Sequence, residues 1–93
     1  MYGTIRIYSG AAELADALVE NQSEVKRIVG EIDGFQAYYL MRTADGAASF
    51  TVYDTEAGAQ ESNNVARSWV AENLPDLQVS APQVAAGEVV INS

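Results

Sequence analysis

The 93-residue chain contains no cysteine and no histidine. Without cysteine there is no disulfide, thiol nucleophile or thiolate metal site, and the redox character of the compartment stays undefined. Without histidine the chain lacks the side chain that most often serves as general base and metal ligand. These two absences exclude more classes of enzyme than any motif in the sequence suggests.

Basic residues are also scarce. Five Lys and Arg stand against 13 Asp and Glu, which gives a formal net charge of -8. This charge repels phosphate backbones and anionic lipid surfaces, so neither nucleic acid nor a membrane is expected as a partner. The N-terminal sequence MYGTIRIYSG lacks the basic start and apolar run of a secretion signal, and no apolar run is long enough to span a membrane. We expect a soluble, cytoplasmic protein.

The composition that remains is that of a folded domain. Hydrophobic residues make up 48% of the chain and charged residues 19%, which is ordinary for a globular protein and unlike a disordered tail. A chain of this length forms one small domain, and no linker, repeat or low-complexity tract divides it. We therefore predict a single domain over residues 1–93.

The stretch FQAYYLMRTADGAASFTVYD, residues 35–54, has the most regular pattern in the chain. Two alternating apolar runs flank Asp45-Gly46, and Asp and Gly are favoured in the type I′ turn of a two-residue hairpin loop. Such a loop determines which residues face one another across the two strands. The predicted pairs are Met41 with Phe50, Tyr39 with Val52, Arg42 with Ser49, Leu40 with Thr51, and Tyr38 with Tyr53.

The segment before the hairpin contains a strand and a helical region. Alternation predicts a strand over Tyr2 to Tyr8, and helical spacing of apolar residues runs from Ala11 to Ile32. The polar residues 21–23 interrupt the apolar stripe. The region is therefore either one helix with a weak middle or two short helices that meet at a bend.

The segment after the hairpin contains a second helix and a last strand. The helix begins after Asp54-Thr55-Glu56, which offers a capping oxygen and an acidic first turn, and it ends at Leu74 before Pro75. Residues 76–87 predict an irregular connection, and Glu88 to Asn92 predict the last strand.

This order of elements predicts an α+β, ferredoxin-like βαββαβ fold with an antiparallel sheet in the order 4-1-3-2 and both helices on one face. Alternation along the strands separates two sets of side chains, and the more apolar set is assigned to the face that the helices cover. That set is Ile5, Ile7, Phe35, Tyr39, Met41, Phe50, Val52, Val89 and Ile91. The uncovered face then carries Tyr2, Thr4, Arg6, Tyr8, Gln36, Tyr38, Leu40, Arg42, Ser49, Thr51, Tyr53, Glu88, Val90 and Asn92.

Several stretches resemble one known superfamily. GFQAYYLMRTADG, a strand that ends in Asp54, TEAGAQESNNVARSWVAENLP and a terminal GEVVI are similar to small members of the dimeric α/β barrel superfamily. This superfamily includes antibiotic-biosynthesis monooxygenase-like and stress-responsive barrel proteins. The resemblance implies that two sheets pack through their uncovered faces in a homodimer. An uncovered face with four tyrosines independently favours an interface with a second copy.

The face predicted to be uncovered also suggests a ligand site. Guanidinium groups bind carboxylates or phenolates, and tyrosines add ring contacts and a hydroxyl, so the face could bind a flat anionic or phenolic molecule. In the alternative reading, the arginines pair with Glu88 or with carboxylates of a second copy, and the tyrosines only pack the interface. The candidate ligand-binding residues are Arg6, Tyr8, Tyr38, Arg42 and Tyr53.

An enzymatic alternative comes from the superfamily. Some monooxygenase-like members oxidise polycyclic phenols without a cofactor, and the resemblance implies Asn63, Asn64, Trp69 and Tyr53 as candidate catalytic residues. The alternative for Trp69 is a place in the core, because it lies on the apolar stripe of its helix. The first strand carries no Asn to match the haem-degrading members, and the chain has no histidine to bind haem. No cofactor is expected.

Two further readings are less favoured. Glu13, Asp16, Glu20 and Glu24 share one helix face and could hold a hard cation, but without converging loop carbonyls they indicate a solvated surface, and no metal is expected. AASFTVYD lacks the basic start and glycine-aromatic spacing of an RNA-recognition strand.

The leading hypothesis is a homodimer that binds a small organic molecule. The alternatives are a cofactor-independent monooxygenase for an aromatic substrate and a structural dimer without a ligand.

Overall fold

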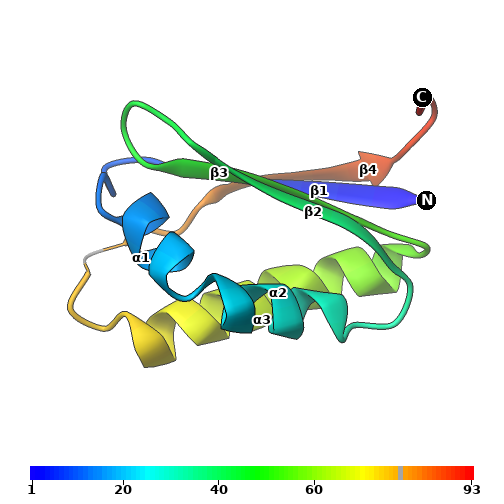
Figure 1. Ribbon diagram of the computed structural model, residues 1–93. Helices are drawn as coiled ribbons and strands as arrows, with labels where there is room; N and C mark the ends of the chain where they lie inside the picture. Colours follow the sequence, from blue (N-terminus) through cyan, green and yellow to red (C-terminus); the bar gives the residue numbers. More distant parts are fainter. Residues whose placement is uncertain (78) are drawn as a thin grey trace.

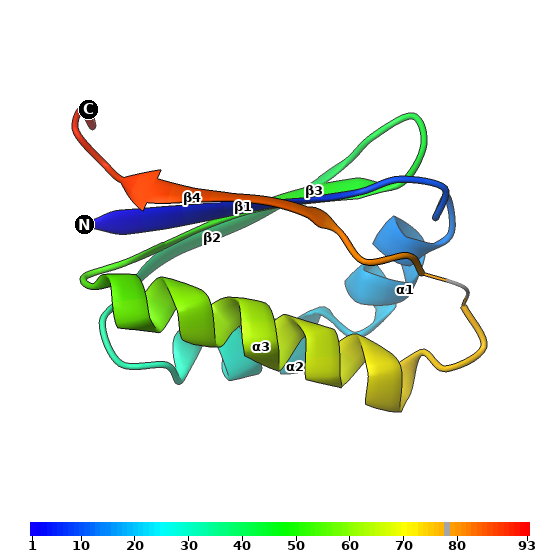
Figure 2. The same ribbon diagram turned by 180° about the vertical axis from the view of Figure 1, so that it is seen from behind.

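Four strands form one antiparallel sheet in the order β2-β3-β1-β4, and three helices cover one of its faces in the computed structural model (Figure 1). Figure 2 shows α3 on the same face from behind. The structure describes residues 1–77 and 79–93. The elements are β1 (Tyr2–Tyr8), α1 (Leu14–Glu20), α2 (Gln22–Gly30), β2 (Phe35–Arg42), β3 (Ala47–Tyr53), α3 (Glu56–Asn73) and β4 (Gln83–Glu88). The predicted ferredoxin-like fold and strand order are confirmed.

The first helical region consists of two helices, which decides between the two alternatives that the sequence leaves open. Asn21 lies between them with a φ of -110°, outside the helical range. Its side-chain Nδ2 donates a hydrogen bond to the backbone oxygen of Ala17 at 2.8 Å. The polar side chain thus competes for the helix backbone, which is why the helix breaks here.

The long helix α3 begins and ends where the sequence predicts. Thr55 is extended and its hydroxyl accepts a hydrogen bond from the backbone N–H of Gly58 at 3.2 Å, so it caps the helix. Leu74 leaves helical geometry before Pro75. Within residues 1–77 and 79–93, no helix has the length and hydrophobicity needed to cross a membrane.

The predicted register of the hairpin is wrong by two residues. Arg42 faces Ala47, Met41 faces Ala48 and Tyr39 faces Phe50, so residues 43–46 form a four-residue loop. A type I′ turn would place Asp45 and Gly46 at positive φ, and neither residue has a positive φ. Gly46 is instead required by close packing, since a Cβ there would lie 2.2 Å from the carbonyl oxygen of Tyr8. The cross-strand partners change, but because the shift is by an even number of residues, each side chain stays on the same face as in the prediction.

The last strand also differs from its prediction. β4 spans Gln83–Glu88, so it lies mostly within residues 76–87, the range predicted to be irregular. Of the predicted strand Glu88 to Asn92, only Glu88 is in a strand. Glu88 pairs with Tyr2, and the backbone N–H of Val89 bonds to the oxygen of Met1, where the first strand runs out. Without a neighbouring strand, Val90 and Ile91 are 81% and 87% exposed. Pairing with β1, and not side-chain pattern, decides where β4 lies.

The predicted assignment of the two faces of the sheet is wrong. We call the side covered by α1, α2 and α3 the helix face and the other side the open face. The helix face carries side chains that the sequence assigned to the uncovered side, and these are buried: Thr4, Arg6, Tyr8, Ser49, Thr51 and Tyr53. The open face carries side chains that the sequence assigned to the core, and these are exposed: Ile5, Ile7, Tyr39, Met41 and Phe50.

Packing of α3 explains this reversal. A Cβ on Gly58 would lie only 3.0 Å from the Cβ of Tyr53, so the start of the helix approaches the sheet closely. Further along α3, Ser62 is fully buried, and the side chains of Asn63 and Thr4 are within hydrogen-bond distance at 3.2 Å. Polar residues of the sheet are thus paired with polar residues of the helix. Alternation shows which side chains share a face, but it does not show which face the helices cover.

Candidate functional site

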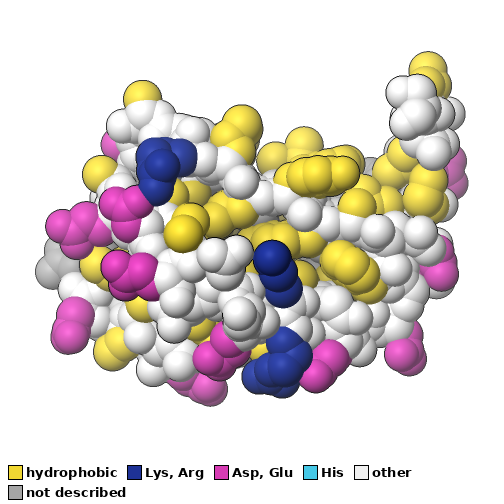
Figure 3. All heavy atoms as spheres, viewed as in Figure 1, with side chains coloured by type: hydrophobic (Ala, Val, Ile, Leu, Met, Phe, Trp, Pro, Cys, Tyr) yellow, Lys and Arg dark blue, Asp and Glu magenta, His cyan; other side chains and the backbone are white. Residues whose placement is uncertain are grey.

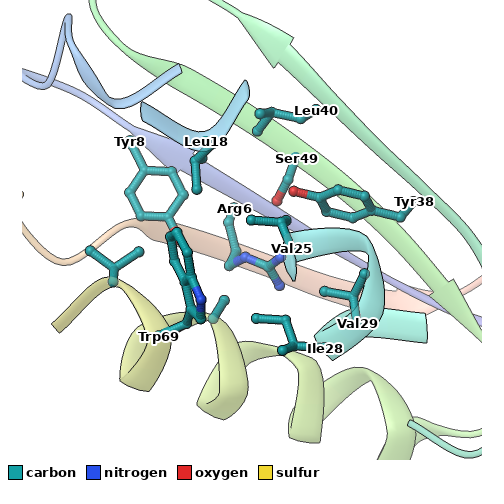
Figure 4. Close-up of a pocket in the computed structure, with 12 residues that line it drawn as sticks. Arg6, Tyr8, Leu18, Val25, Ile28, Val29, Tyr38, Leu40, Ser49 and Trp69 are labelled. Carbon is teal, nitrogen blue, oxygen red and sulfur yellow. The ribbon is translucent and has the colours of Figure 1, made fainter. Parts of the chain in front are cut away.

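A small cavity lies between the helix face and the three helices (Figure 4). We call it the Arg6 cavity. Its volume is about 30 Å³, enough for roughly one or two water molecules. The sheet, α1, α2 and α3 all contribute to its wall. The lining residues are Arg6, Tyr8, Leu18, Val25, Ile28, Val29, Tyr38, Leu40, Ser49, Ala66, Trp69 and Val70.

Arg6 projects from the middle of β1 into the centre of this lining (Figure 4). Its side chain is only 3% exposed. Nη1 donates to Asn63 Oδ1 at 2.8 Å and to Ser62 Oγ at 3.4 Å, whereas Nε has no hydrogen-bond partner in the described part of the chain. Neither of the two ion pairs between described residues includes Arg6. The guanidinium is therefore a buried cation whose described partners are all neutral.

Ser49 lies directly opposite Arg6 in the pairing of β1 with β3. It is 4% exposed, and among residues 1–77 and 79–93 its hydroxyl has no hydrogen-bond partner. Sequence reasoning placed Ser49 on the face of Arg6 but did not select it as a site residue. The register between β1 and β3 would have supplied the signal, because it places the hydroxyl beside the guanidinium.

Tyr38 and Tyr8 are the two predicted tyrosines that line the cavity. Figure 4 shows the Tyr38 hydroxyl directed toward Ser49. Burial raises the pKa of Tyr38 above its ordinary value of 10.0, although the positive charge of Arg6 acts in the opposite direction. The Tyr38 hydroxyl is therefore protonated at neutral pH and can donate a hydrogen bond to a ligand.

Trp69 forms the wall on the side of α3. It is buried, as the reading of a core residue predicted, but it also faces the cavity. Its Nε1 donates to Glu24 Oε1 of α2 at 3.0 Å. It is the only tryptophan in the chain, so its fluorescence reports on this cavity.

Three of the predicted site residues lie elsewhere. The Tyr53 hydroxyl donates to the backbone oxygen of Val29 at 2.8 Å, and burial raises the pKa of Tyr53. Arg42 is exposed and forms an ion pair with Asp16, not with Glu88 as the alternative reading expected. Asn64 is also exposed and accepts a hydrogen bond from Arg67 Nη2 at 3.2 Å. The structure thus gives these residues no contact with the Arg6 cavity.

Haem does not fit this cavity. Haem iron takes an axial ligand from His, Cys, Met or Tyr; the chain has neither His nor Cys, and of these types only Tyr8 and Tyr38 line the cavity. Met41 lies on the open face, on the other side of the sheet. The cavity volume of about 30 Å³ is also far too small for the macrocycle.

Solved structures of similar fold cover nearly the whole chain. A protein of unknown function from Nitrosomonas europaea has a TM-score of 0.70 and 19% identity, covering 99% of this chain and 90% of that chain. The heme degrader MhuD from Mycobacterium tuberculosis, with two hemes bound in its active site, has a TM-score of 0.71 and 16% identity, covering 100% and 99%. A monooxygenase from the gene ActVA-Orf6 of Streptomyces coelicolor, in complex with nanaomycin D, has a TM-score of 0.61 and 15% identity, covering 99% and 91%.

The chain matches no protein-family model and no curated protein. At identities below 20%, the likeness to the three solved structures concerns the fold. The shared fold agrees with the fold that the resemblance of the sequence motifs implies. This chain therefore has the same ferredoxin-like α+β fold as these solved structures.

Proposed function

We propose that this protein binds a small organic molecule with a carboxylate or phenolate group, and that this group lies against Arg6. The observation that carries the proposal is the burial of Arg6 without a carboxylate partner in the described part of the chain. Burying a charge without a counter-charge is costly. An anionic ligand would supply the missing charge.

The other lining residues suit such a ligand. Arg6 Nε and the Ser49 hydroxyl are two free hydrogen-bonding groups on neighbouring residues, and both could donate to one oxygen anion. Tyr8, Tyr38 and Trp69 surround them with aromatic rings. A few polar groups within an apolar lining are typical of sites for small organic ligands.

The test measures binding of benzoate, phenol and the neutral analogue benzamide. Calorimetry and the fluorescence of Trp69 are the two readouts. We expect benzoate to bind and benzamide to bind at least tenfold more weakly. Arg6→Gln should weaken benzoate binding by about 10- to 100-fold, since a hydrogen bond to a charged group is worth about 1.5–3 kcal/mol. The matched control is Arg27→Gln, which changes an exposed arginine of α2 that pairs with Glu31 and lines neither space. Equal affinity of benzoate and benzamide would contradict the proposal.

A second candidate is a cofactor-independent monooxygenase that acts on a quinol or anthrone. The observation that favours it is that the Tyr38 hydroxyl, which is protonated at neutral pH, and Trp69 line one cavity. Dioxygen would convert the methylene group of an anthrone to a carbonyl, with water as the second product. Oxygen uptake with a panel of quinols and anthrones tests this. We expect Tyr38→Phe to abolish uptake and Tyr53→Phe to retain it, because the Tyr53 hydroxyl is bonded to Val29.

We also propose that two copies pair through the open face. Its exposed side chains Ile5, Ile7, Tyr39, Met41 and Phe50 form an apolar surface of the kind that marks an interface. Figure 3 shows hydrophobic side chains along the upper side of the molecule, where the sheet lies. A hollow of about 350 Å³ among Ile5, Tyr39, Met41 and Phe50 offers a place for side chains of a second copy. If neither ligand binding nor oxygen uptake is found, a structural dimer without a ligand is the reading that remains.

A further inference from the structure

Tyr8 lines both the Arg6 cavity and a larger hollow. We call this hollow the α3 groove. It has a volume of about 450 Å³ and lies between the second half of α3 and the connection to β4. Tyr8 and Val70 line both spaces. The remaining lining residues of the groove are Arg67, Ala71, Leu74, Pro75, Leu77, Val79, Ser80, Ala81 and Pro82.

The two spaces differ in the part of a ligand that they can accept. The Arg6 cavity has polar donors but room for only roughly one or two water molecules. The α3 groove is lined mainly by apolar side chains, and its volume falls within the range of about 300–1,000 Å³ that is usual for ligand sites. The Arg6 cavity has room for the carboxylate group of an organic anion, and the rest of the molecule needs space beyond it.

We propose that the two spaces form one site for an elongated ligand, and that Tyr8 is the gate between them. The anionic end would lie at Arg6 and the apolar body in the α3 groove. This inference rests on the proposed function, because it assumes an anion at Arg6. It adds a class of ligand: a monocarboxylate with an unbranched apolar body.

The positions on β1 fit such a ligand. Arg6 and Tyr8 are two residues apart on the same face of the strand, so their Cα atoms are separated by about 7 Å. A ligand that passes Tyr8 therefore needs a spacer of a few methylene groups between its carboxylate and its bulk. Figure 4 shows Tyr8 and Trp69 together at one end of the lining of the Arg6 cavity.

Rotation of Tyr8 could connect the two spaces without breaking the hydrogen bonds that hold the helices. The hydrogen bond from Arg6 to Asn63 joins α3 to the sheet. The bond from Tyr53 to Val29 joins α2 to the sheet, and the bond from Trp69 to Glu24 joins α2 to α3. Displacing either helix would break these bonds. A change of side-chain rotamer at Tyr8 breaks none of them.

The experiment compares benzoate, 3-phenylpropanoate and 5-phenylpentanoate by calorimetry. Burial of each additional methylene group is worth about fourfold in affinity. We expect 5-phenylpentanoate to bind at least tenfold more tightly than benzoate. If benzoate binds and the longer acids bind no better, the elongated site is wrong while the proposed function stands. If no acid binds, the proposed function fails and the elongated site fails with it.

Two variants locate the apolar body of the ligand. Ala71→Trp fills the groove from the exposed side of α3 and should remove the gain with chain length while changing benzoate affinity less than twofold. The control is Ala57→Trp, the same substitution at an exposed position near the start of α3 and outside the groove. Tyr8→Ala removes the gate and should speed association of 5-phenylpentanoate. A gain with chain length that persists in Ala71→Trp would overturn the inference.

Discussion

Arg6 and Ser49 face each other across β1 and β3, and each keeps a buried polar atom without a hydrogen-bond partner in the described part of the chain. Leaving such a group unpaired costs about 1–3 kcal/mol of folding free energy. Two unpaired groups on neighbouring residues, both facing one cavity, indicate a site that is completed by a ligand or by water. Removal of an unpaired group from this pair should therefore weaken ligand binding without lowering the stability of the free protein.

Ser49→Ala tests this relationship. The substitution removes an unpaired hydroxyl, so we expect the free energy of unfolding without ligand to stay the same or to rise by up to about 1 kcal/mol. Benzoate binding should weaken by about fivefold because one donor is lost. Ser62→Ala is the control, since its hydroxyl donates to the Ala59 oxygen at 2.6 Å, and its loss should lower stability by about 1 kcal/mol. Urea unfolding and calorimetry provide the two measurements, and unchanged binding in Ser49→Ala would remove Ser49 from the site.

Tyr53→Phe should affect stability and leave binding unchanged. The lost hydroxyl is fully buried and bonded to the Val29 oxygen at 2.8 Å, so the free energy of unfolding should fall by about 1–2 kcal/mol. Ser68→Ala, at an exposed position of α3, is the control and should change stability by less than about 0.5 kcal/mol. A loss of benzoate binding in Tyr53→Phe would show that Tyr53 acts in the site after all.

Met41→Lys tests the proposed pairing through the open face. Light scattering behind size exclusion should give twice the chain mass of 9.9 kDa for the unaltered protein. A lysine at this apolar position should weaken the dimer by about 100-fold, because it buries an unpaired charge in the interface. Arg42→Glu alters the next residue, whose partner Asp16 lies on the helix side, and the dimer should persist. A monomeric mass for the unaltered protein would exclude the pairing.

Stability should decrease in strongly alkaline solution because of Tyr38 and Tyr53. Burial raises the pKa of both hydroxyls above 10.0 in the folded protein, so the folded state favours their protonated forms. The resulting stabilisation is fully present below about pH 10 and is lost as the pH rises through the raised pKa values. Urea unfolding at about pH 8 and about pH 11 should show the decrease. Tyr38→Phe should reduce this decrease, because it removes one of the two hydroxyls whose pKa burial raises.

Some of the candidate site could be predicted from the sequence. Arg6, Tyr8 and Tyr38 were selected because their chemistry suits an anionic or phenolic ligand, and all three line one cavity. Arg42 was selected by the same argument, but it lies at the end of β2, where Asp16 is within reach. Residue type shows what a side chain can bind, whereas burial and nearby partners decide whether it is free to do so.

The sequence by itself determined the order of the elements, a capped start of α3 at Asp54-Thr55-Glu56, its end at Leu74-Pro75 and which side chains share a face of each strand. These features depend on local conformational preferences and on periodicity, which neighbouring residues specify. Only the tertiary structure decided the face that the helices cover, the extent of β4 and the position of the cavity. The physical reason is that each depends on pairs distant in sequence: Arg6 with Asn63, Tyr2 with Glu88, and Arg6 with Ser49. Polar and apolar sets alternate equally well on either side of a sheet, and contacts with α3 place the polar set inside.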